Sequence, residues 1–451
     1  MRRIIRIPPM KSIVVLLAFI FAQLIPALAA EKPHIVFVLA DDMGFGDVGC
    51  YGGGIAPTPN LDRLAREGTR FTRWYAAAPI CSPSRCGLIT GQFPARWKIT
   101  SFLQARAGNR ECEQADFLDA NAPSLPRLLR GAGYATAHVG KWHLGGGRDV
   151  SDAPKFSAYG YDLGLGTYES PEPAAPLGLK TVPWGPDAKR EPQQVARHDR
   201  TRWMVDAALD FLKTNAAKPC FVNLWLDDTH TPWVPAADAK TPRENLAAII
   251  VEMDRQIGRL MDALPPETLL VFATDNGSLP TLNGARNTGL RGSKLSLYEG
   301  GTRLPFIARW PGHIPAARVD ESTVLAAVDL FPTFAKIAGA KIPDGCDGED
   351  VSAALLGQPF ARTKPILWEY GRNEKSFTFP KPPDRSPNLA MLDGGWKFLI
   401  NADGTGAELY DIFADPNEAK NLAESQAVTT AKMRDALLQW RRSLPVITVA
   451  E

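Results

Sequence analysis

Short apolar runs alternate along the first two thirds of the chain with longer segments in which apolar residues recur at helical spacing. The continuous apolar runs, typical of strands covered on both faces, span residues 35–39, 71–76, 135–139, 221–226 and 268–274. The segments with helical spacing span residues 59–67, 124–130, 203–213 and 243–263. This alternation predicts an α/β fold with a large mixed, mostly parallel sheet flanked by helices.

The pattern changes after about Arg362, where short runs are separated by turns. These runs predict antiparallel strands over residues 366–370, 389–392, 396–400 and 408–410, followed by a helix over 429–442. We therefore expect a catalytic domain over residues 31–362 and a smaller C-terminal α+β domain with an antiparallel sheet over 363–451. The Pro- and Gly-rich stretch 154–192 predicts long surface loops over the edge of the main sheet.

Residues 1–30 have the three parts of a secretory signal peptide. Basic residues come first, an apolar run spans residues 13–22, and Ala27-Leu28-Ala29 supplies the small residues that signal peptidase accepts. A membrane anchor is the weaker interpretation, because Gln23 and Pro26 interrupt the apolar run. We expect an exported protein, periplasmic or extracellular, without a membrane attachment after cleavage.

Composition and charge exclude two classes of protein. The 451 residues include 51 Lys and Arg against 49 Asp and Glu, which gives a formal charge of +2, and 45% are hydrophobic. These values are ordinary for a globular protein and exclude a disordered chain or a strongly basic nucleic-acid-binding protein. Removal of residues 1–30 takes away four basic residues and changes the formal charge from +2 to −2. No nucleic-acid partner is expected.

Polar and ionisable residues follow the ends of several predicted strands. They are Asp41-Asp42, Lys141 and His143, the segment 227–230, and Asp275-Asn276. In open α/β sheets the ligand crevice lies outside the carboxyl ends of the strands, so these residues are expected to face one crevice. The oxygens of the two acidic segments suit Ca²⁺ or Mg²⁺. Taken alone, the Asp pair is equally compatible with a solvated loop or a helix cap.

Cys81 begins the most specific motif in the chain. The segment Cys81-Ser82-Pro83-Ser84-Arg85 places a thiol just before a proline, where a helix is expected to begin. A helix N-terminus stabilises an anion, and Arg85 lies within the first turn. We interpret the thiol as reactive and not as buried and structural, with one half of a disulfide as the alternative.

The motif Cys81-Ser82-Pro83-Ser84-Arg85-x-x-Leu88-x-Thr90-Gly91 resembles the active-site signature of the type I sulfatases, arylsulfatase-like members of the alkaline phosphatase superfamily. Further segments that agree with this family, in its order, are 41–47, 140–145, 274–277, 297–301 and 408–422. The resemblance covers nearly the whole chain after residue 30. It implies an alkaline phosphatase-like fold and a sulfuric ester hydrolase that releases inorganic sulfate.

The resemblance also implies a modified nucleophile. In such sulfatases a maturation enzyme, here an expected partner, reads Cys-x-Pro-x-Arg and oxidises the cysteine to formylglycine (3-oxoalanine). Cys81 matches that position. One hydroxyl of the hydrated aldehyde attacks sulfur, and the second then collapses to the aldehyde and expels sulfate. A serine lacks this route of release.

A bound Ca²⁺ is implied as the cofactor, because it binds a sulfate oxygen and polarises sulfur. Its implied ligands are Asp41, Asp42, the modified Cys81, Asp275 and Asn276. Arg85 is implied to orient the hydrated aldehyde and to stabilise its deprotonated form.

Four further residues are implied to contact the hydrated aldehyde or the sulfate group. Lys141 and His143, two apart on a loop after a strand, face the hydrated aldehyde, and His143 acts as the base in the release step. His230 protonates the leaving oxygen. Lys294 is implied to contact sulfate. This assignment rests on its spacing to the 297–301 segment, and the alternative is that Lys294 is a surface lysine.

One position departs from the family pattern. Many relatives carry a second histidine before their His-x-Pro element, where this chain has Asp227 in the segment Asp227-Asp228-Thr229-His230-Thr231-Pro232. We hypothesise that carboxylates at this position accept hydrogen bonds from sugar hydroxyls and repel a second anionic group of the substrate.

The expected substrate is a sulfated carbohydrate. Trp97, Trp184 and Trp233 lie in predicted loops where their rings can stack on sugars, although packing explains any single one as well, including Trp142 in the catalytic segment. A phosphonate or phosphate diester hydrolase of the same superfamily is the first alternative. A catalytically inactive protein that binds sulfated glycans is the second.

The remaining histidines and the cysteines carry further expectations. The six cysteines are Cys50, Cys81, Cys86, Cys112, Cys220 and Cys346. Conversion of Cys81 leaves five thiols, which allow at most two disulfides, and Cys86 is expected to be the buried free thiol. His138 is expected in the core because it lies within a strand, and His198 is expected at the surface.

Overall fold

The computed structural model describes residues 32–177, 195–237, 239–376 and 382–446. Residues Pro33–Glu451 form one compact unit, separate from Met1–Lys32. The expected signal peptide and Trp184 lie outside the described residues. Within the described ranges, no helix is both long and apolar enough to cross a membrane.

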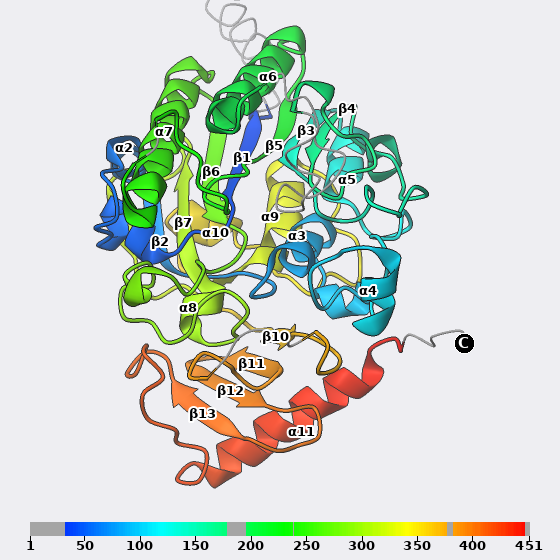
Figure 1. Cartoon of the computed structure of the whole chain (residues 1–451), viewed down its shortest axis with the longest axis vertical. Coiled ribbons are helices and arrows are strands. Elements are labelled where there is room, and N and C mark those ends of the chain that lie inside the picture. Colours follow the sequence, from blue (N-terminus) through cyan, green and yellow to red (C-terminus); the bar gives the residue numbers. More distant parts are fainter. Residues whose placement is uncertain (1–31, 178–194, 238, 377–381, 447–451) are drawn as a thin grey trace, which may run out of the picture. The chain divides into compact units, whose positions relative to one another are not determined.

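A nine-stranded sheet forms the centre of this unit (Figure 1). Its strands are β1 (Ile35–Ala40), β2 (Thr69–Tyr75), β3 (Ala135–Lys141), β4 (Leu163–Thr167), β5 (Cys220–Trp225), β6 (Leu269–Thr274), β7 (Arg303–Arg309), β8 (Arg318–Asp320) and β9 (Leu325–Ala326). The order is β4-β3-β5-β1-β6-β7-β2-β8, with β9 paired to β2. Only β7 is antiparallel to its neighbours, β6 and β2, so the predicted mixed, mostly parallel sheet is confirmed.

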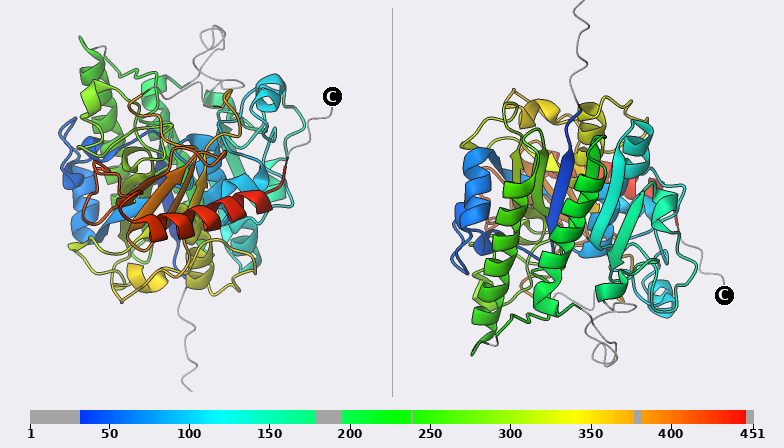
Figure 2. Two further views of the ribbon diagram at one scale, coloured as in Figure 1. Left: turned by 90° about the horizontal axis from the view of Figure 1, so that it is seen from below. Right: turned by 90° about the horizontal axis from the view of Figure 1, so that it is seen from above.

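Helices cover both faces of the main sheet. The α-helices within the described residues are α2 (Pro59–Glu67), α3 (Cys81–Thr90), α4 (Arg106–Glu111), α5 (Leu125–Gly131), α6 (Arg200–Thr214), α7 (Pro242–Ala263), α8 (Glu299–Thr302), α9 (Leu330–Ile337), α10 (Ser352–Leu355) and α11 (Ala427–Ser443). Figure 2 shows α6 and α7 lying side by side across one face. Along β1, Val36 and Val38 pack into the core on that face, whereas Phe37 and Leu39 pack into the core with α3 and α9. Successive side chains of β1 point to opposite faces of the sheet because side-chain direction in a strand repeats every two residues.

The structure corrects two sequence-based expectations about local structure. Lys141 is the last residue of β3 and not part of a loop, and only His143 lies beyond the strand. The stretch 154–192, expected to form loops, contains β4, which pairs in parallel with β3 at the edge of the sheet. The two glycines in LGLGT, Gly164 and Gly166, weaken the strand signal, and the parallel pairing with β3 stabilises the strand instead.

A second, four-stranded antiparallel sheet follows. It consists of β10 (Ile366–Glu369), β11 (Leu389–Asp393), β12 (Trp396–Ile400) and β13 (Glu408–Asp411), in that order. Helix α11 packs against β11 and β12 (Figure 1). Trp368 Nε1 donates a hydrogen bond to the carbonyl of Ala76 at 2.8 Å, which ties this sheet to the segment between β2 and α3. The predicted antiparallel sheet is confirmed, while a domain boundary after residue 362 stays a prediction.

Candidate active site

The carboxyl ends of four parallel strands bring the sequence-predicted residues together. Asp41 follows β1, Asp275 follows β6, and the segment 227–230 follows β5. The Asp41 N–H donates to the carbonyl of Asp228 at 2.8 Å, and the Asp275 N–H donates to that of Ala40 at 3.1 Å. These backbone contacts continue the parallel ladders past the strand ends. The predicted crevice at one edge of the sheet is therefore present.

Three cations and three carboxylates meet at this edge, each cation against one carboxylate. Arg85 donates from Nε and Nη2 to Asp275 Oδ2 at 3.0 and 2.6 Å. Lys141 Nζ lies 2.5 Å from Asp41 Oδ2. Lys294 Nζ lies 2.6 Å from Asp42 Oδ1, which shows that Lys294 belongs to the cluster and not to the surface. None of the six side chains is more than 8% exposed.

The neighbouring charges favour the ionised forms of Asp42 and Lys294. Burial by itself raises the pKa of Asp42, but the charges of Lys294 and Lys141 oppose this, and the pKa lies well below its usual range. Burial lowers the pKa of Lys294, and the charge of Asp42 more than reverses this effect. The pKa of Asp275 is raised by burial and by Asp41, against the opposing charge of Arg85. With all six groups charged, the cluster has a formal charge of zero.

The cluster has the donor set that a hard divalent cation requires. Asp41 Oδ1 and Asn276 Oδ1 are buried and have no hydrogen-bond partner among the described residues. Asp42 and Asp275 contribute further oxygens, and the Asp42 N–H bonds Asp275 Oδ1 at 3.2 Å. Asp41, Asp42 and His230 each also offer one potential ligand atom, and these three atoms all lie within 4.8 Å of one another. Oxygen ligands of this kind fit Ca²⁺, and unpaired buried oxygens are costly without a cation.

His230 is held as a neutral imidazole with a defined tautomer. Its Nδ1 lies 2.8 Å from the carbonyl of Thr231, which can only accept, so the proton is on Nδ1. Nε2 then accepts from Lys294 Nζ at 3.2 Å. Burial lowers the pKa of His230 well below its usual value. The sequence-based expectation was that His230 carries the proton for the leaving oxygen. In this structure Lys294 carries that proton, and His230 Nε2 accepts a hydrogen bond from Lys294 and can receive the proton from it.

His143 presents a free lone pair. Its Nε2 donates to the carbonyl of Leu103 at 3.1 Å, which leaves Nδ1 unprotonated and without a hydrogen-bond partner among the described residues. Burial lowers the pKa of His143 to about 4, so the ring is neutral at pH 7. A neutral imidazole with an unpaired Nδ1 is the form that a general base requires.

Cys81 differs from the sequence-based interpretation. It begins α3 as predicted, but its side chain is 2% exposed, and burial raises the pKa of the thiol despite the neighbouring Lys141 and Lys294. The helix N-terminus is thus outweighed by desolvation, and the interpretation as an exposed, activated thiol was wrong. All six cysteines are free, and Cys86 is buried as predicted.

Asp227 also differs from its expected role. Its Oδ2 lies 3.0 Å from Arg200 Nη1, its Oδ1 accepts from the hydroxyl of Thr167 at 2.7 Å, and its side chain is 0% exposed. Asp228 is likewise paired, 2.7 Å from Arg197 Nη1. Both carboxylates are satisfied inside the protein. The hypothesis that Asp227 contacts sugar hydroxyls is therefore wrong, because the carboxylate is buried between β4 and α6.

Comparison with known proteins agrees with this geometry. The sequence profile of the Sulfatase family matches residues 33–340, and that of N-sulphoglucosamine sulphohydrolase, C-terminal, matches residues 293–443. The chain belongs to the sulfatase family. The predicted family is thus confirmed, and this sulfatase is a sulfuric ester hydrolase.

Similar proteins cover nearly the whole sulfatase. An N-acetylgalactosamine-6-O-sulfatase of Bacteroides thetaiotaomicron is 27% identical over 90% of this chain and 93% of its own. Human arylsulfatase A is 30% identical over 91% of this chain and 87% of its own. The crystal structure of Ps i-CgsB in complex with k-i-k-neocarrahexaose has a TM-score of 0.72 and 26% identity, covering 91% of this chain and 93% of that one.

The sequence analysis also singled out His138 and several tryptophans. His138 is 0% exposed in the core, as predicted, and burial lowers its pKa to about 3. Trp142 is also fully buried and packs against Phe156 and other rings. Trp97 is half-buried and lines a cavity of about 480 Å³ with Lys98. Trp233 is likewise partly exposed, and its Nε1 donates to the carbonyl of Thr229 at 2.9 Å. Trp97 and Trp233 are therefore accessible to a ligand, whereas Trp142 is not.

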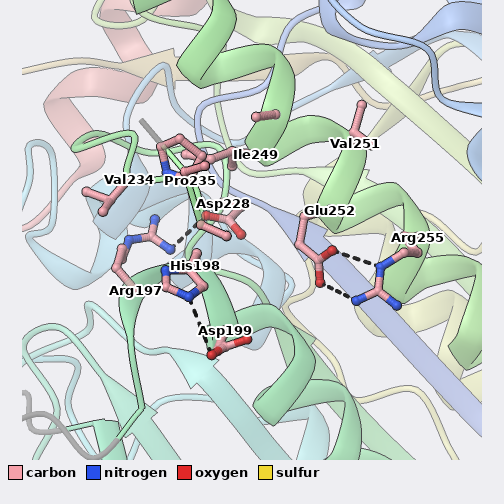
Figure 3. A pocket seen from close by; sticks show the side chains of 13 residues that line it. Arg197, His198, Asp199, Asp228, Val234, Pro235, Ile249, Val251, Glu252 and Arg255 are labelled. Atoms are coloured by element: carbon pink, nitrogen blue, oxygen red, sulfur yellow. Dashed lines mark hydrogen bonds and ion pairs between the residues drawn. The ribbon is translucent and has the colours of Figure 1, made fainter. Parts of the chain in front are cut away.

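The loop that carries His230 borders a second cavity, of about 410 Å³. His198, which is partly exposed as expected, lines it together with Arg197 and Asp228. In Figure 3, Arg197 points toward Asp228 and His198 toward Asp199. Arg197 Nη2 also donates to the carbonyls of Asp227 and His230 at 3.2 and 3.3 Å, so this arginine holds the loop in place.

Sequence reasoning missed two buried contributors to the sulfatase site. Arg286 bonds Asp47 through Nε at 2.9 Å and donates from Nη2 to the carbonyl of Asp42 at 2.7 Å, which fixes the backbone of the acidic pair. Glu169 lies beside His143. Asp47 was part of a recognised motif, but no local signal marks Arg286, 239 residues away, as its partner.

Proposed function

We propose that this sulfatase removes sulfate esters from a carbohydrate, with a formylglycine formed from Cys81 and a bound Ca²⁺. The observation that carries the proposal is the neutral cluster of three buried cations and three carboxylates around Cys81. A divalent cation in this cluster of buried side chains would give it a net formal charge of +2. Such a site favours a sulfate group and the negative charge that develops as its ester bond breaks.

Ca²⁺ would be held by Asp41, Asp42, Asp275 and Asn276. Asp41 Oδ1 and Asn276 Oδ1 are the oxygens of this set that have no hydrogen-bond partner among the described residues. When bound, it polarises a sulfate oxygen and makes sulfur more electrophilic. The hydrated aldehyde of residue 81 supplies one hydroxyl as the nucleophile and a second that allows sulfate to leave. Maturation by an enzyme that recognises Cys-x-Pro-x-Arg is part of the proposal.

The chain's own residues orient the reactants and move protons. Arg85, fixed by Asp275 and by the carbonyl of Lys141, presents a rigid cation beside residue 81. The Lys294 ammonium, hydrogen-bonded to His230 Nε2, is the source of the proton that the leaving alcohol needs. His143 Nδ1 is the acceptor for the proton released at residue 81.

Carbohydrate specificity is supported by the relatives and by the cavity that Trp97 lines. The named relatives include N-acetylgalactosamine-6-sulfatases, and one similar structure holds a neocarrahexaose. In this chain the partly exposed Trp97 and the neighbouring Lys98 offer an aromatic face and a cation to a sulfated sugar. The N-terminal leader supports export to the periplasm or the medium, where such polymers are met.

The decisive experiment is mass spectrometry of the tryptic peptide that contains Cys81, after expression with a formylglycine-generating enzyme. The expected mass is that of an aldehyde, and sulfatase turnover should rise with the converted fraction. Full turnover with an unmodified thiol would contradict the proposal. Assays with sulfate esters and with phosphate or phosphonate diesters test the alternative, which predicts faster turnover of the diesters.

A further inference from the structure

Glu169 places a buried carboxylate against the imidazole of His143. Glu169 Oε2 lies 3.5 Å from His143 Nε2, and the residue is 3% exposed. Its other oxygen, Oε1, accepts a hydrogen bond from Arg148 Nε at 2.6 Å. Because Arg148 holds one oxygen, the second stays directed at the ring.

The backbone of these three residues is strained. His143, Arg148 and Glu169 all have left-handed conformations, with φ of 54°, 47° and 39°. A left-handed conformation is unfavourable for residues other than glycine and is often retained at functional sites. The two loops are in close contact, since a Cβ on Gly146 would lie 2.4 Å from the nitrogen of Pro171. The tight packing of the two loops fixes the position of the carboxylate.

We propose that Glu169 is a positioning residue for His143, whose imidazole it orients and whose imidazolium it stabilises when Nδ1 accepts a proton. This inference rests on the proposed function of the site. In the release step the proton moves from a hydroxyl group on residue 81 to His143 Nδ1. The electron pair of that O–H bond forms the aldehyde C=O bond, and the pair of the C–O bond leaves with sulfate.

The charges around His143 explain why it needs such a partner. Lys141, at the end of β3, and Arg85, on α3, both disfavour the imidazolium in addition to burial. Glu169, after β4, and the carbonyl of Leu103 act in the opposite direction. Replacement of Glu169 by a neutral residue leaves two cations against the ring and only the Leu103 carbonyl to support its positive charge.

The test compares the wild-type enzyme with the isosteric variant Glu169→Gln, using a chromogenic aryl sulfate. We expect kcat to fall about tenfold to a hundredfold, a part of the ~10²–10⁴ that a general base contributes. kcat/KM should stay nearly constant, because sulfate transfer precedes the affected step. Mass spectrometry of acid-quenched enzyme should then show residue 81 carrying an added SO₃ group, a readout independent of turnover.

Matched variants separate this role from a structural one. Glu172→Gln makes the same substitution in the same loop, at a side chain that accepts a hydrogen bond from the N–H of Phe156 at 2.8 Å and not from His143 or Arg148. This variant should behave like the wild type. Arg148→Gln frees the outer oxygen of Glu169 and should give a smaller effect in the same direction, which keeps the test available if Glu169→Gln fails to fold.

Two outcomes overturn the inference without touching the proposed function. One is an unchanged kcat in Glu169→Gln, and the other is an equal fall in kcat and kcat/KM with no sulfated enzyme. A wild-type enzyme that lacks the aldehyde or sulfatase turnover overturns the proposed function instead.

Discussion

Arg200 and Asp227 form an ion pair of 3.0 Å in which neither side chain is more than 1% exposed. Arg200 lies in the first turn of α6, and Asp227 follows β5, so the pair joins a helix to the strand end that leads into the His230 loop. Thr167 at the end of β4 adds a hydrogen bond to the same carboxylate. The carboxylate therefore stabilises the edge of the site, and it is not available to a substrate.

Asp227→Asn should consequently lower stability. Loss of one partner of a buried ion pair leaves an uncompensated charge and costs about 3–5 kcal/mol. Urea unfolding measures this, with Asp199→Asn, a more exposed carboxylate next to the same helix, as the control. The relative rates on singly and doubly sulfated sugars should not change. Unaltered unfolding together with a changed substrate preference would restore the sugar-contact hypothesis.

Removal of the cation should destabilise the protein. A cation at a hundredfold excess over its Kd stabilises the folded state by about 2.7 kcal/mol, so Ca²⁺ added to chelated protein should raise the melting temperature. Asp42→Asn should abolish this shift because the residue faces the unpaired oxygens of the cluster. Asp262→Asn, at an exposed carboxylate paired with Arg63, should retain it. A melting temperature insensitive to Ca²⁺ in the fully active enzyme would argue against the cation.

His138 should make stability fall in mild acid. Burial lowers its pKa to about 3, whereas the unfolded chain takes up the proton near 6.5. This contribution to stability is fully present above 6.5, and it is lost as the pH falls toward 3, by about 1.4 kcal/mol per unit. Denaturant unfolding at pH 7.5 and 5.5 should show a smaller difference in His138→Phe than in the wild type. His313→Gln, at an exposed ring, should show the wild-type difference.

Glu418 should make stability fall as the pH rises, which is the opposite of the effect of His138. Glu418 and Glu299 share the buried Lys397, at 3.1 and 2.8 Å, between the second sheet and α8. Burial raises the pKa of Glu418 to about 7, although Lys397 opposes it. A raised carboxyl pKa contributes stability that is complete below about 4.5 and is lost as the pH rises through 7. Glu418→Gln should therefore be more stable than the wild type at pH 8 and less so at pH 5. Equal stabilities at both values would contradict this.

Local pattern was sufficient for the strands and helices that frame the site, and for the residues that follow them. Continuous apolar runs such as 35–39 predicted buried strands, and strand direction then placed Asp41, Lys141 and Asp275 at one edge. β4 was missed because its glycines carry little strand signal, and its pairing with β3 supplies the stability that its own composition lacks.

The sequence by itself determined the family, the strands and helices that frame the site, and which residues meet at the carboxyl edge of the sheet, because these depend on short-range periodicity and contiguous motifs. Only the tertiary structure decided the charge partners. Asp227 with Arg200, Arg286 with Asp47, and Glu169 with His143 are separated by 27, 239 and 26 residues, and their pairing depends on how distant segments pack. Burial likewise decided protonation, because the cost of desolvation raised the pKa of Cys81 where the helix N-terminus had suggested the reverse.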